Sequence, residues 1–394
     1  MNSSISRLIT YINSGLGRFW LFLLPLIYFI RVHNKRVDFP CYHIAGGRYF
    51  NAENLYILTD TWPYKYPPVA AFFFQPLAIF SLNFSKVLFY ILAFITMAAT
   101  YKLILEVLAN GKKIEKKFTI IPFLLVLRFH FYDFANLQVN SLMLFLIIFG
   151  FILVNDNKIF KGAILFSLGG LFKIIPFFLS FYFLLKGEFK KFFSIVGVFF
   201  AIQLIPLLTY GIDGYINLLK NYSYLMGQSH SFYSGDRILQ SATSLIARYT
   251  EYFNIFTDEK SRHLFLFAMI VLAMVPLAFM LVKKITSKES ALIEFSYCCL
   301  FYPLVNPVGW RHAHVFIVPA VIILFYYIYN LKLYKQLKYK TLIALYFVFN
   351  VISSKFLAGS KLSHLGDYLS LNVLALFVLF YGLYLIHTDS LDRK

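Results

Sequence analysis

Residues 137–154 read LQVNSLMLFLIIFGFILV, a run of helix length without a charged side chain. Similar apolar runs of about 20 residues recur along the chain, and a helix of that length crosses the roughly 30 Å of hydrocarbon in a bilayer. In lipid only helices and closed barrels satisfy their own backbone, and these runs lack the alternation of barrel strands. The sequence therefore predicts an all-α, polytopic integral membrane protein.

The composition of the whole chain agrees with this class. Of its 394 residues 60% are hydrophobic and only 14% are charged, and the mean hydropathy is +0.69. A soluble globular chain carries about 25% charged residues. The three cysteines, Cys41, Cys298 and Cys299, form neither a disulfide framework nor a metal-ligand spacing, so we expect packing roles for the adjacent pair.

The net charge of +19 comes largely from lysines in short segments between the apolar runs. Lysine-rich short loops mark the cytoplasmic side of a membrane protein. The charge therefore orients the chain and attracts anionic lipid head groups, and it does not indicate nucleic-acid binding. These segments are 109–117, 155–161, 186–191, 283–288 and 332–340.

With those segments inside the cell, the chain threads the cell membrane through roughly 10–12 transmembrane helices and leaves both termini cytoplasmic. No small-residue cleavage site precedes Arg31, so we expect the N-terminal run to be retained as a span. The predicted spans are 12–31, 86–108, 118–134, 137–154, 192–210, 262–283, 290–304, 315–332, 341–358 and 369–387.

Two of the apolar stretches do not read as single crossings. Residues 67–82 are short, and a full crossing there would reverse the charge rule, so we expect an interfacial or re-entrant helix on the outer side. Residues 160–185 join two lysine-bearing segments. Lys173 and Pro176 are expected to break this stretch into two short helices, with Lys173 at a turn that points outward.

We expect one membrane domain over residues 1–394, because no internal repeat or separate soluble domain is visible. Residues 31–85 form its first outer loop with interfacial helices, and residues 211–261 form a large outer loop. In the first loop, Gly46 and Gly47 are expected to allow a turn. Its acids Asp60 and Glu53 are expected to be solvated.

Polar groups without an obvious structural role lie in the outer segments, where ionisable residues near membrane depth are expensive and usually functional. Their convergence predicts an active site on the outer face. They are Asp38, Asp133, Gln138, Asn140, Lys173, Asp236, Arg237, Gln240, Arg248, Arg311, His312 and His314.

Each of these groups also has an ordinary structural interpretation. Asp38 fits a solvated helix cap, and Lys173 fits a cation that snorkels to the interface. His312 and His314 fit neighbours in an aromatic belt, and a metal site would need more clustered ligands. The segment TWPYKYPP (61–68) fits an interfacial aromatic anchor.

The sequence has no Walker loop, no GxGxxG after a strand, no GxSxG and no HExxH. Nucleotide-dependent chemistry on the cytoplasmic side is therefore unsupported. An outer site needs a substrate that arrives in the membrane, and a lipid phosphate carrying the reacting group meets that need. Arg and Lys would bind its phosphate, and a groove of Phe and Leu would hold its tail.

Six motifs occur in an order that is similar to a known family: DFPCYHIAGGRYFNAENLY, KYPPVAAFFFQPLAIF, NLQVNSLMLFLIIFG, KGAILFSLGGLFKIIPFFLSFYFLL, ILQSATSLIAR and NPVGWRHAHVFIVPA. The chain resembles the polyprenol-phosphate-dependent glycosyltransferases of family 87, the alpha-mannosyltransferase-like proteins of the GT-C superfamily. It departs from their pattern at four positions. Leu137 replaces a usual Gly, Leu239 a usual Asn and Asn306 a usual Ser, while Arg311 stands where an acid is frequent.

This resemblance implies a GT-C fold and an inverting transfer of a hexose, mannose by family analogy, from a polyprenyl phosphate to a glycolipid or glycan hydroxyl. It implies no cofactor or metal, and the expected partners are donor, acceptor and membrane lipids. Asp38 matches the first-loop aspartate that acts as general base. The substrate-binding residues that it implies are Tyr42, Tyr66, Pro67, Pro68, Gln138, Asn140, Lys173, Arg237, Gln240, Arg248, Trp310 and His312.

A transporter or lipid flippase is the main alternative, and a non-catalytic scaffold is a second one. Transporters commonly show inverted repeats with matching broken helices in both halves. This sequence has a single lysine-centred break and an unmatched outer loop after residue 210, which favours the enzyme.

Overall fold

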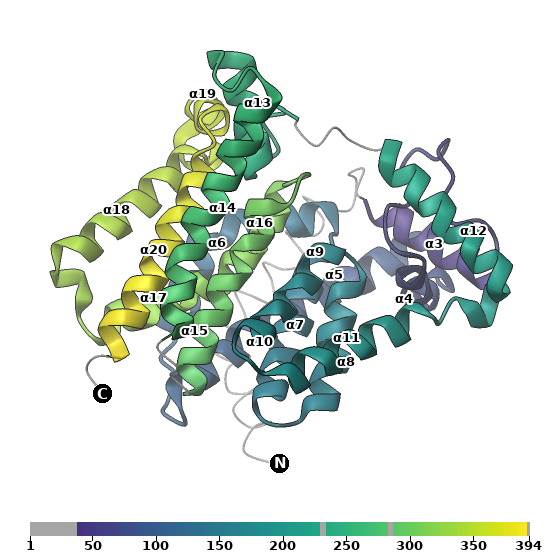
Figure 1. Ribbon diagram of the computed structural model, residues 1–394, viewed down its shortest axis with the longest axis horizontal. Coiled ribbons are helices and arrows are strands. Elements are labelled where there is room, and N and C mark those ends of the chain that lie inside the picture. The colour runs from purple at the N-terminus through teal and green to yellow at the C-terminus, as the bar shows by residue number, and fades with distance from the viewer. Residues whose placement is uncertain (1–37, 229–233, 283–286, 392–394) are drawn as a thin grey trace.

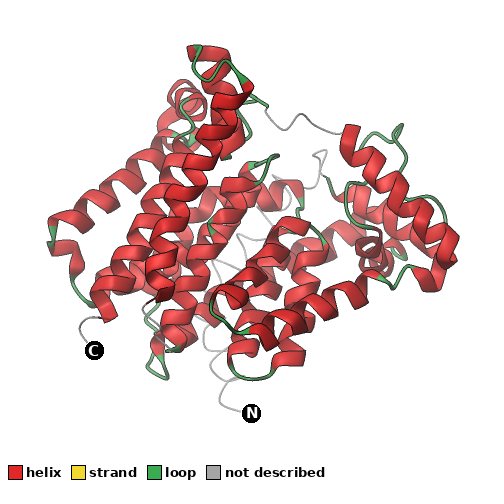
Figure 2. Ribbon diagram, in the orientation of Figure 1, coloured by secondary structure: helices red, strands yellow, loops and turns green. Residues whose placement is uncertain are grey.

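The computed structural model describes residues 38–228, 234–282 and 287–391, and these fold almost entirely as helices (Figure 1, Figure 2). Within those ranges there is no strand, and Leu239 and Trp310 form only an isolated antiparallel bridge. The all-α class predicted from the sequence is confirmed. The predicted first span, 12–31, lies outside the described residues.

The first half of the chain contains α3 (Phe39–Phe50), α4 (Pro68–Ala78), α5 (Leu82–Ala109), α6 (Lys117–Asn136), α7 (Asn140–Asn155), α8 (Ile159–Leu171), α9 (Ile174–Phe177), η2 (Phe178–Ser180), α10 (Phe181–Leu185), α11 (Phe189–Gln203) and α12 (Leu207–Gln228). The second half contains α13 (Ala242–Phe253), α14 (Glu259–Val282), α15 (Lys288–Cys299), α16 (Phe301–Val305), η3 (Arg311–Ile317), α17 (Val318–Asn330), η4 (Leu333–Lys335), α18 (Leu337–Ile352), α19 (Lys355–Tyr368) and α20 (Leu371–Leu391).

Several of these helices are long and apolar enough to cross a membrane, which confirms the polytopic class. Five pass this test on their own among the described residues, and six pass if α11 and α12 count as one broken span. The predicted span over α7 is a shorter apolar helix, and residues 160–185 form the expected pair of short apolar segments, α8 and α9–α10. The number of crossings, 10–12, therefore stays a prediction. The five are Leu82–Ala109, Lys117–Asn136, Glu259–Val282, Arg311–Asn330 and Leu371–Asp389.

The predicted span 192–210 is not one straight helix. The helix α11 ends at Gln203, and α12 leaves it at 88°. Pro206 lies between them, and a proline both lacks a helical N–H donor and disfavours helical backbone at the residue before it. Much of the predicted outer loop 211–261 is consequently helical, in α12 and α13.

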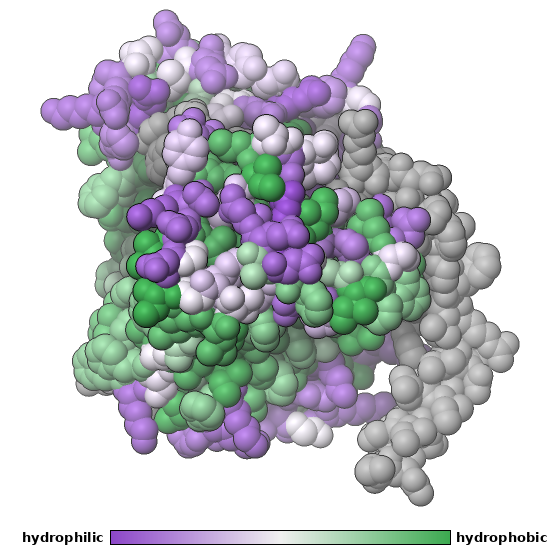
Figure 3. Space-filling model, turned by 90° about the vertical axis from the view of Figure 1, so that its right-hand side faces the viewer, coloured by the Kyte–Doolittle hydropathy of each residue, from purple (hydrophilic) through white to green (hydrophobic). Residues whose placement is uncertain are grey.

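Helix α12 is amphipathic. After the non-helical Gly211 (φ 65°), the exposed apolar residues Ile212, Ile216 and Leu219 recur at helical spacing, while Leu218 is buried against the rest of the protein. A helix with one apolar face exposed lies in the plane of a membrane interface rather than across it. Figure 3 views the molecule from this side and shows a hydrophobic band between hydrophilic ends.

The described lysine-rich segments meet at one end of the molecule, which we call the lysine end. Lys288 pairs with Asp156 at 2.5 Å, and Lys191 donates to Asn155 at 3.1 Å. The turn after α5 lines a hollow with the same Asp156 and Lys288. The opposite end, where α6 meets α7 and α19 meets α20, is called the polar end here. The separation of lysine-rich segments from the other polar segments in the sequence therefore correctly predicted that they lie at opposite ends of the molecule.

Small residues bring α7 and α8 together. A Cβ added to Gly150 would lie 2.8 Å from the carbonyl oxygen of Gly162, so the two backbones touch. Such close crossings between small residues are a common way for helices to pack in membranes. Because α7 and α8 pack closely, the break between α8 and α9 lies close to the start of α7.

Gly46 and Gly47 do not form the expected turn, because both lie inside α3. A Cβ on Gly46 would lie 2.7 Å from the carbonyl oxygen of Phe74, whereas one on Gly47 would meet no atom within 4 Å. Gly46 therefore serves the close contact between α3 and α4. The prediction of a turn at the glycine pair is wrong. Gly46 is required by close packing against α4 and not by an unusual backbone conformation.

We expect Gly46→Ala to destabilise the protein by about 1–3 kcal/mol, because an extra methyl group must push α4 away from α3. Thermal unfolding in detergent measures this effect. Gly47→Ala is the matched control, and it should be neutral or slightly stabilising because alanine favours a helix and the site is open. Equal destabilisation by both substitutions would refute the close-contact explanation.

Candidate active site

The first outer loop is attached to the end of α6 next to Asp38. The backbone N–H of Asp38 donates to Asn136 O at 3.2 Å. Leu137 follows with a left-handed backbone (φ 48°), and the N–H of Gln138 then bonds to Asp133 O at 3.0 Å. This conformation costs an L-residue roughly 1–2 kcal/mol. Leu137 is one of the positions where the sequence departs from the motif pattern, which has a glycine there. The turn directs Gln138 toward Asp38.

The side-chain amide of Gln138 joins three functional groups. Its Nε2 donates to Asp38 Oδ2, and its Oε1 accepts from Lys173 Nζ at 3.4 Å and from the Tyr42 hydroxyl at 3.3 Å. Asp38 is the N-cap residue of α3, but its side chain makes no capping hydrogen bond there. The carboxylate therefore serves this cluster. Its Oδ1 accepts no hydrogen bond from the described residues.

Aromatic residues of the first loop form the wall beside Asp38. The hydroxyls of Tyr42 and Tyr66 lie 2.6 Å apart, and the Tyr42 ring stacks on Phe74 with centroids 4.7 Å apart. Pro67 and Pro68 start α4, and proline suits the first helical position because no N–H is needed there. The expected helix after Tyr-Pro-Pro is present, and four of the predicted binding residues lie together.

Lys173 lies in the break between α8 and α9, as predicted. Its ammonium donates to Asn140 Oδ1 at 3.0 Å, and Asn140 in turn donates to Asp133 Oδ1 at 2.8 Å. Pro176 lies inside α9 and does not form the break itself. Tyr302, which no motif singled out, donates to Asn140 Oδ1 at 3.4 Å.

Burial raises the pKa of the Asp38 carboxyl above its ordinary value. The hydrogen bond from Gln138 and the positive charges of Lys173 and Lys65 act against this shift without cancelling it. Lys65 is the second cation of the site, and burial lowers the pKa of its ammonium. A carboxylate with a raised pKa is a stronger base than a solvated one.

His312 and Trp310 belong to the same end of the protein. His312 is buried, and Lys173 lies near enough for its charge to act on the imidazole. Trp310 is partly exposed, and its ring lies parallel to that of His312 at 6.2 Å. Among the described residues, no three His, Cys, Asp or Glu side chains gather as metal ligands would.

Arg248 and Gln240 are engaged elsewhere. Arg248 is fully buried, and its guanidinium donates to the carbonyl of Leu239 at 2.6 Å and to Ser370 Oγ at 2.6 Å. Gln240 donates to the carbonyls of Asp367 and, at 2.8 Å, of half-buried Arg237. Arg248 and Gln240 thus attach the segment before α13 to the junction of α19 and α20. Neither hydrogen-bonds to Gln138 within the described residues.

Two ion pairs were not foreseen. Arg311 pairs with Asp367 and also donates to the Tyr132 hydroxyl at 2.6 Å. Asp367 is a lone acid between apolar residues, and that isolation is the only signal that the sequence offers. Asp60, expected to be solvated, instead pairs with Arg48 at 2.5 Å and 2.9 Å, because the loop folds back on α3.

The geometry defines a polytopic membrane protein with the carboxylates of Asp38 and Asp133, the ammonium groups of Lys65 and Lys173 and several tyrosine hydroxyls gathered at the polar end. The model of glycosyltransferase family 87 matches residues 64–307, more than half of the chain, and the chain belongs to that family. It is therefore a membrane glycosyltransferase, and the transporter alternative is set aside. No curated protein and no solved structure matches it.

The matched range covers Tyr66, Gln138 and Lys173, but it begins after Asp38 and ends before His312. The roles of the individual residues therefore stay predictions. What the structure adds is their proximity, since Asp38 reaches Gln138 by a direct hydrogen bond.

Removal of the Gln138 hydrogen bond should change the pH dependence of transfer if Asp38 acts as a base. This bond favours the ionised carboxylate and lowers its pKa. Gln138→Leu should therefore raise the pKa of Asp38 and move the acid limb of the kcat/KM profile to higher pH. The exposed Gln228→Leu serves as control and should leave the profile in place. An unmoved acid limb in Gln138→Leu would contradict this coupling.

Proposed function

We propose that this glycosyltransferase moves a hexose from a polyprenyl-phosphate-linked donor to a hydroxyl group of a lipid or glycan. The observation that supports it is the group formed by Asp38, Gln138 and Lys173. A base and a cation lie on either side of one amide, at one end of a set of membrane-spanning helices. A donor anchored in the membrane would reach this end without a soluble nucleotide.

Asp38 would act on the acceptor. Its Oδ1 takes the proton of the acceptor hydroxyl while the acceptor oxygen forms a bond to C1 of the sugar. The bond between C1 and the phosphate oxygen breaks on the opposite face, and its electron pair leaves with the polyprenyl phosphate. The configuration at C1 is thereby inverted.

Lys173 would stabilise the leaving phosphate. Its ammonium donates to the neutral amide oxygens of Gln138 and Asn140. A cation held in a site with little water stabilises developing negative charge more strongly than one in bulk solvent. The hydroxyls of Tyr42 and Tyr66 are suited to bind the sugar, since each both donates and accepts. Mannose remains the family-level expectation for this sugar.

The reaction would take place on the extracytoplasmic face. The lysine end carries the segments that the positive-inside rule assigns to the cytoplasm. The Gln138 cluster lies at the opposite end, so a donor in the outer leaflet would present its phosphate there. Both termini would then be cytoplasmic.

We expect Asp38→Asn to reduce transfer at least about 100-fold, because general base catalysis typically contributes 10²–10⁴. The measurement follows labelled hexose from a polyprenyl-phosphate donor into glycolipid or glycan in membranes that contain the variant. Asp213→Asn removes an exposed acid of α12 and should leave transfer unchanged. Full transfer by Asp38→Asn would exclude the carboxylate as base.

Sidedness is tested by cysteine labelling with a membrane-impermeant maleimide. The native cysteines are all buried, so they give little background. Glu53→Cys, in the first outer loop, should react from outside intact cells, whereas Lys113→Cys, at the lysine end, should react only after the membrane is opened. The reverse pattern would overturn the proposed orientation.

A further inference from the structure

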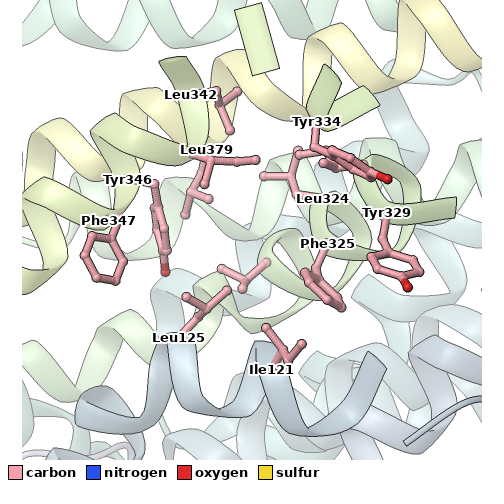
Figure 4. Close-up of a pocket in the computed structure, with 13 residues that line it drawn as sticks. Ile121, Leu125, Leu324, Phe325, Tyr329, Tyr334, Leu342, Tyr346, Phe347 and Leu379 are labelled. Atoms are coloured by element: carbon pink, nitrogen blue, oxygen red, sulfur yellow. The ribbon is translucent and has the colours of Figure 1, made fainter. Parts of the chain in front are cut away.

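An apolar groove of about 470 Å³ lies between α6, α17, α18 and α20 (Figure 4). Leucine, isoleucine, valine and aromatic side chains line it, and tyrosine hydroxyls are the polar groups of its lining. Ile121, Ile343 and Phe347 along its rim are exposed, so the groove opens to the surface. Because α6, α17 and α20 belong to candidate membrane spans, that surface faces hydrocarbon.

Arg128 is not a lining residue of the groove but follows it toward the polar end. On α6, Arg128 follows the groove residue Leu125 by one helical turn. Its guanidinium donates to Asn350 O at 3.0 Å and to Asn372 Oδ1. Asn350 follows the groove residue Tyr346 by one turn on α18, and its side-chain amide donates to Tyr346 O at 3.0 Å. A positive charge therefore lies directly beyond the apolar walls.

The charge of Arg128 is poorly compensated. Its two hydrogen-bond acceptors are neutral, and its Nε has no partner among the described residues. The carboxylate that acts on it, Asp367, is already paired with Arg311. Three guanidinium groups, those of Arg128, Arg248 and Arg311, thus share this one carboxylate. An enclosed cation without its own counter-ion is unfavourable, and an anion that binds there offsets this penalty.

We propose that the groove and Arg128 form a binding site for an anionic phospholipid, with its phosphate on the guanidinium and one acyl chain along the groove. Arginine is well suited to phosphate because its planar donors match the phosphate oxygens. The apolar walls match a hydrocarbon chain. The guanidinium contacts Asn350 and Asn372, which lie near the polar-end termini of α18 and α20.

This site is distinct from that of the sugar donor. Arg128 precedes Asn136, the residue bonded to Asp38, by two turns of α6, about 12 Å at 1.5 Å per residue. A donor phosphate must lie beside the acceptor and therefore next to Asp38. The phospholipid is bound as a structural component that joins α18 to α6 and α20, and its binding does not depend on the proposed reaction.

The test compares purified full-length protein in nanodiscs of phosphatidylglycerol and of phosphatidylcholine. We expect native mass spectrometry to find one retained phosphatidylglycerol per chain and thermal unfolding to show a higher Tm in that lipid. Arg128→Gln should reduce the retained lipid at least tenfold and abolish the difference in Tm. Ile343→Trp, which fills the groove at an exposed position and leaves Arg128 intact, should have the same effect.

Lys361→Gln is the matched control, because it removes an exposed positive charge of α19 outside the groove and should keep the lipid. Three results would overturn the proposal. One is retention of phosphatidylglycerol by both Arg128→Gln and Ile343→Trp, and another is equal retention of phosphatidylcholine by the wild-type protein. The third is one-for-one displacement of the lipid by polyprenyl phosphate, which would assign the groove to the carrier.

Discussion

The Gln138 amide lies between a carboxylate and an ammonium, and the rest of the candidate site depends on that position. A direct ion pair between Asp38 and Lys173 would weaken the base and occupy the cation. The amide instead donates to the carboxylate and accepts from the ammonium, so each of these groups keeps further capacity for hydrogen bonds. Its orientation requires the left-handed backbone at Leu137, whose strain the buried packing of the α6–α7 turn must offset.

The positive groups at the polar end have different uses. Lys173 bonds only to neutral amide oxygens among the described residues and remains able to meet an anion. Arg248 is enclosed and uses its donors to attach the loop before α13 to Ser370. Arg128 lies between these cases, since it links two helices and still carries uncompensated charge. Residue type alone does not separate the three, because the outcome depends on which acceptors each side chain reaches.

Much of the architecture could be predicted, while several local contacts could not. The break at Lys173 was predicted from a lysine and a proline in an apolar stretch between two lysine-bearing segments, although Pro176 itself lies inside α9. The 88° bend after α11 was missed, although Pro206 signals a helix end. The apolar composition of a segment does not show in which direction its helix axis runs. The Arg48–Asp60 pair was missed since its partners meet only when the loop folds back.

The amino-acid sequence by itself determined the membrane class, the separation of the lysine end from the polar end, and the kinds of residue in the site. These properties follow from hydrophobicity and charge, which act locally and need no knowledge of neighbours. Only the tertiary structure decided that Asp38 meets Gln138, 100 positions further on, and that Arg248 is committed to packing. Such contacts depend on how helix backbones cross, and the crossing at Gly46 depends on one absent side chain.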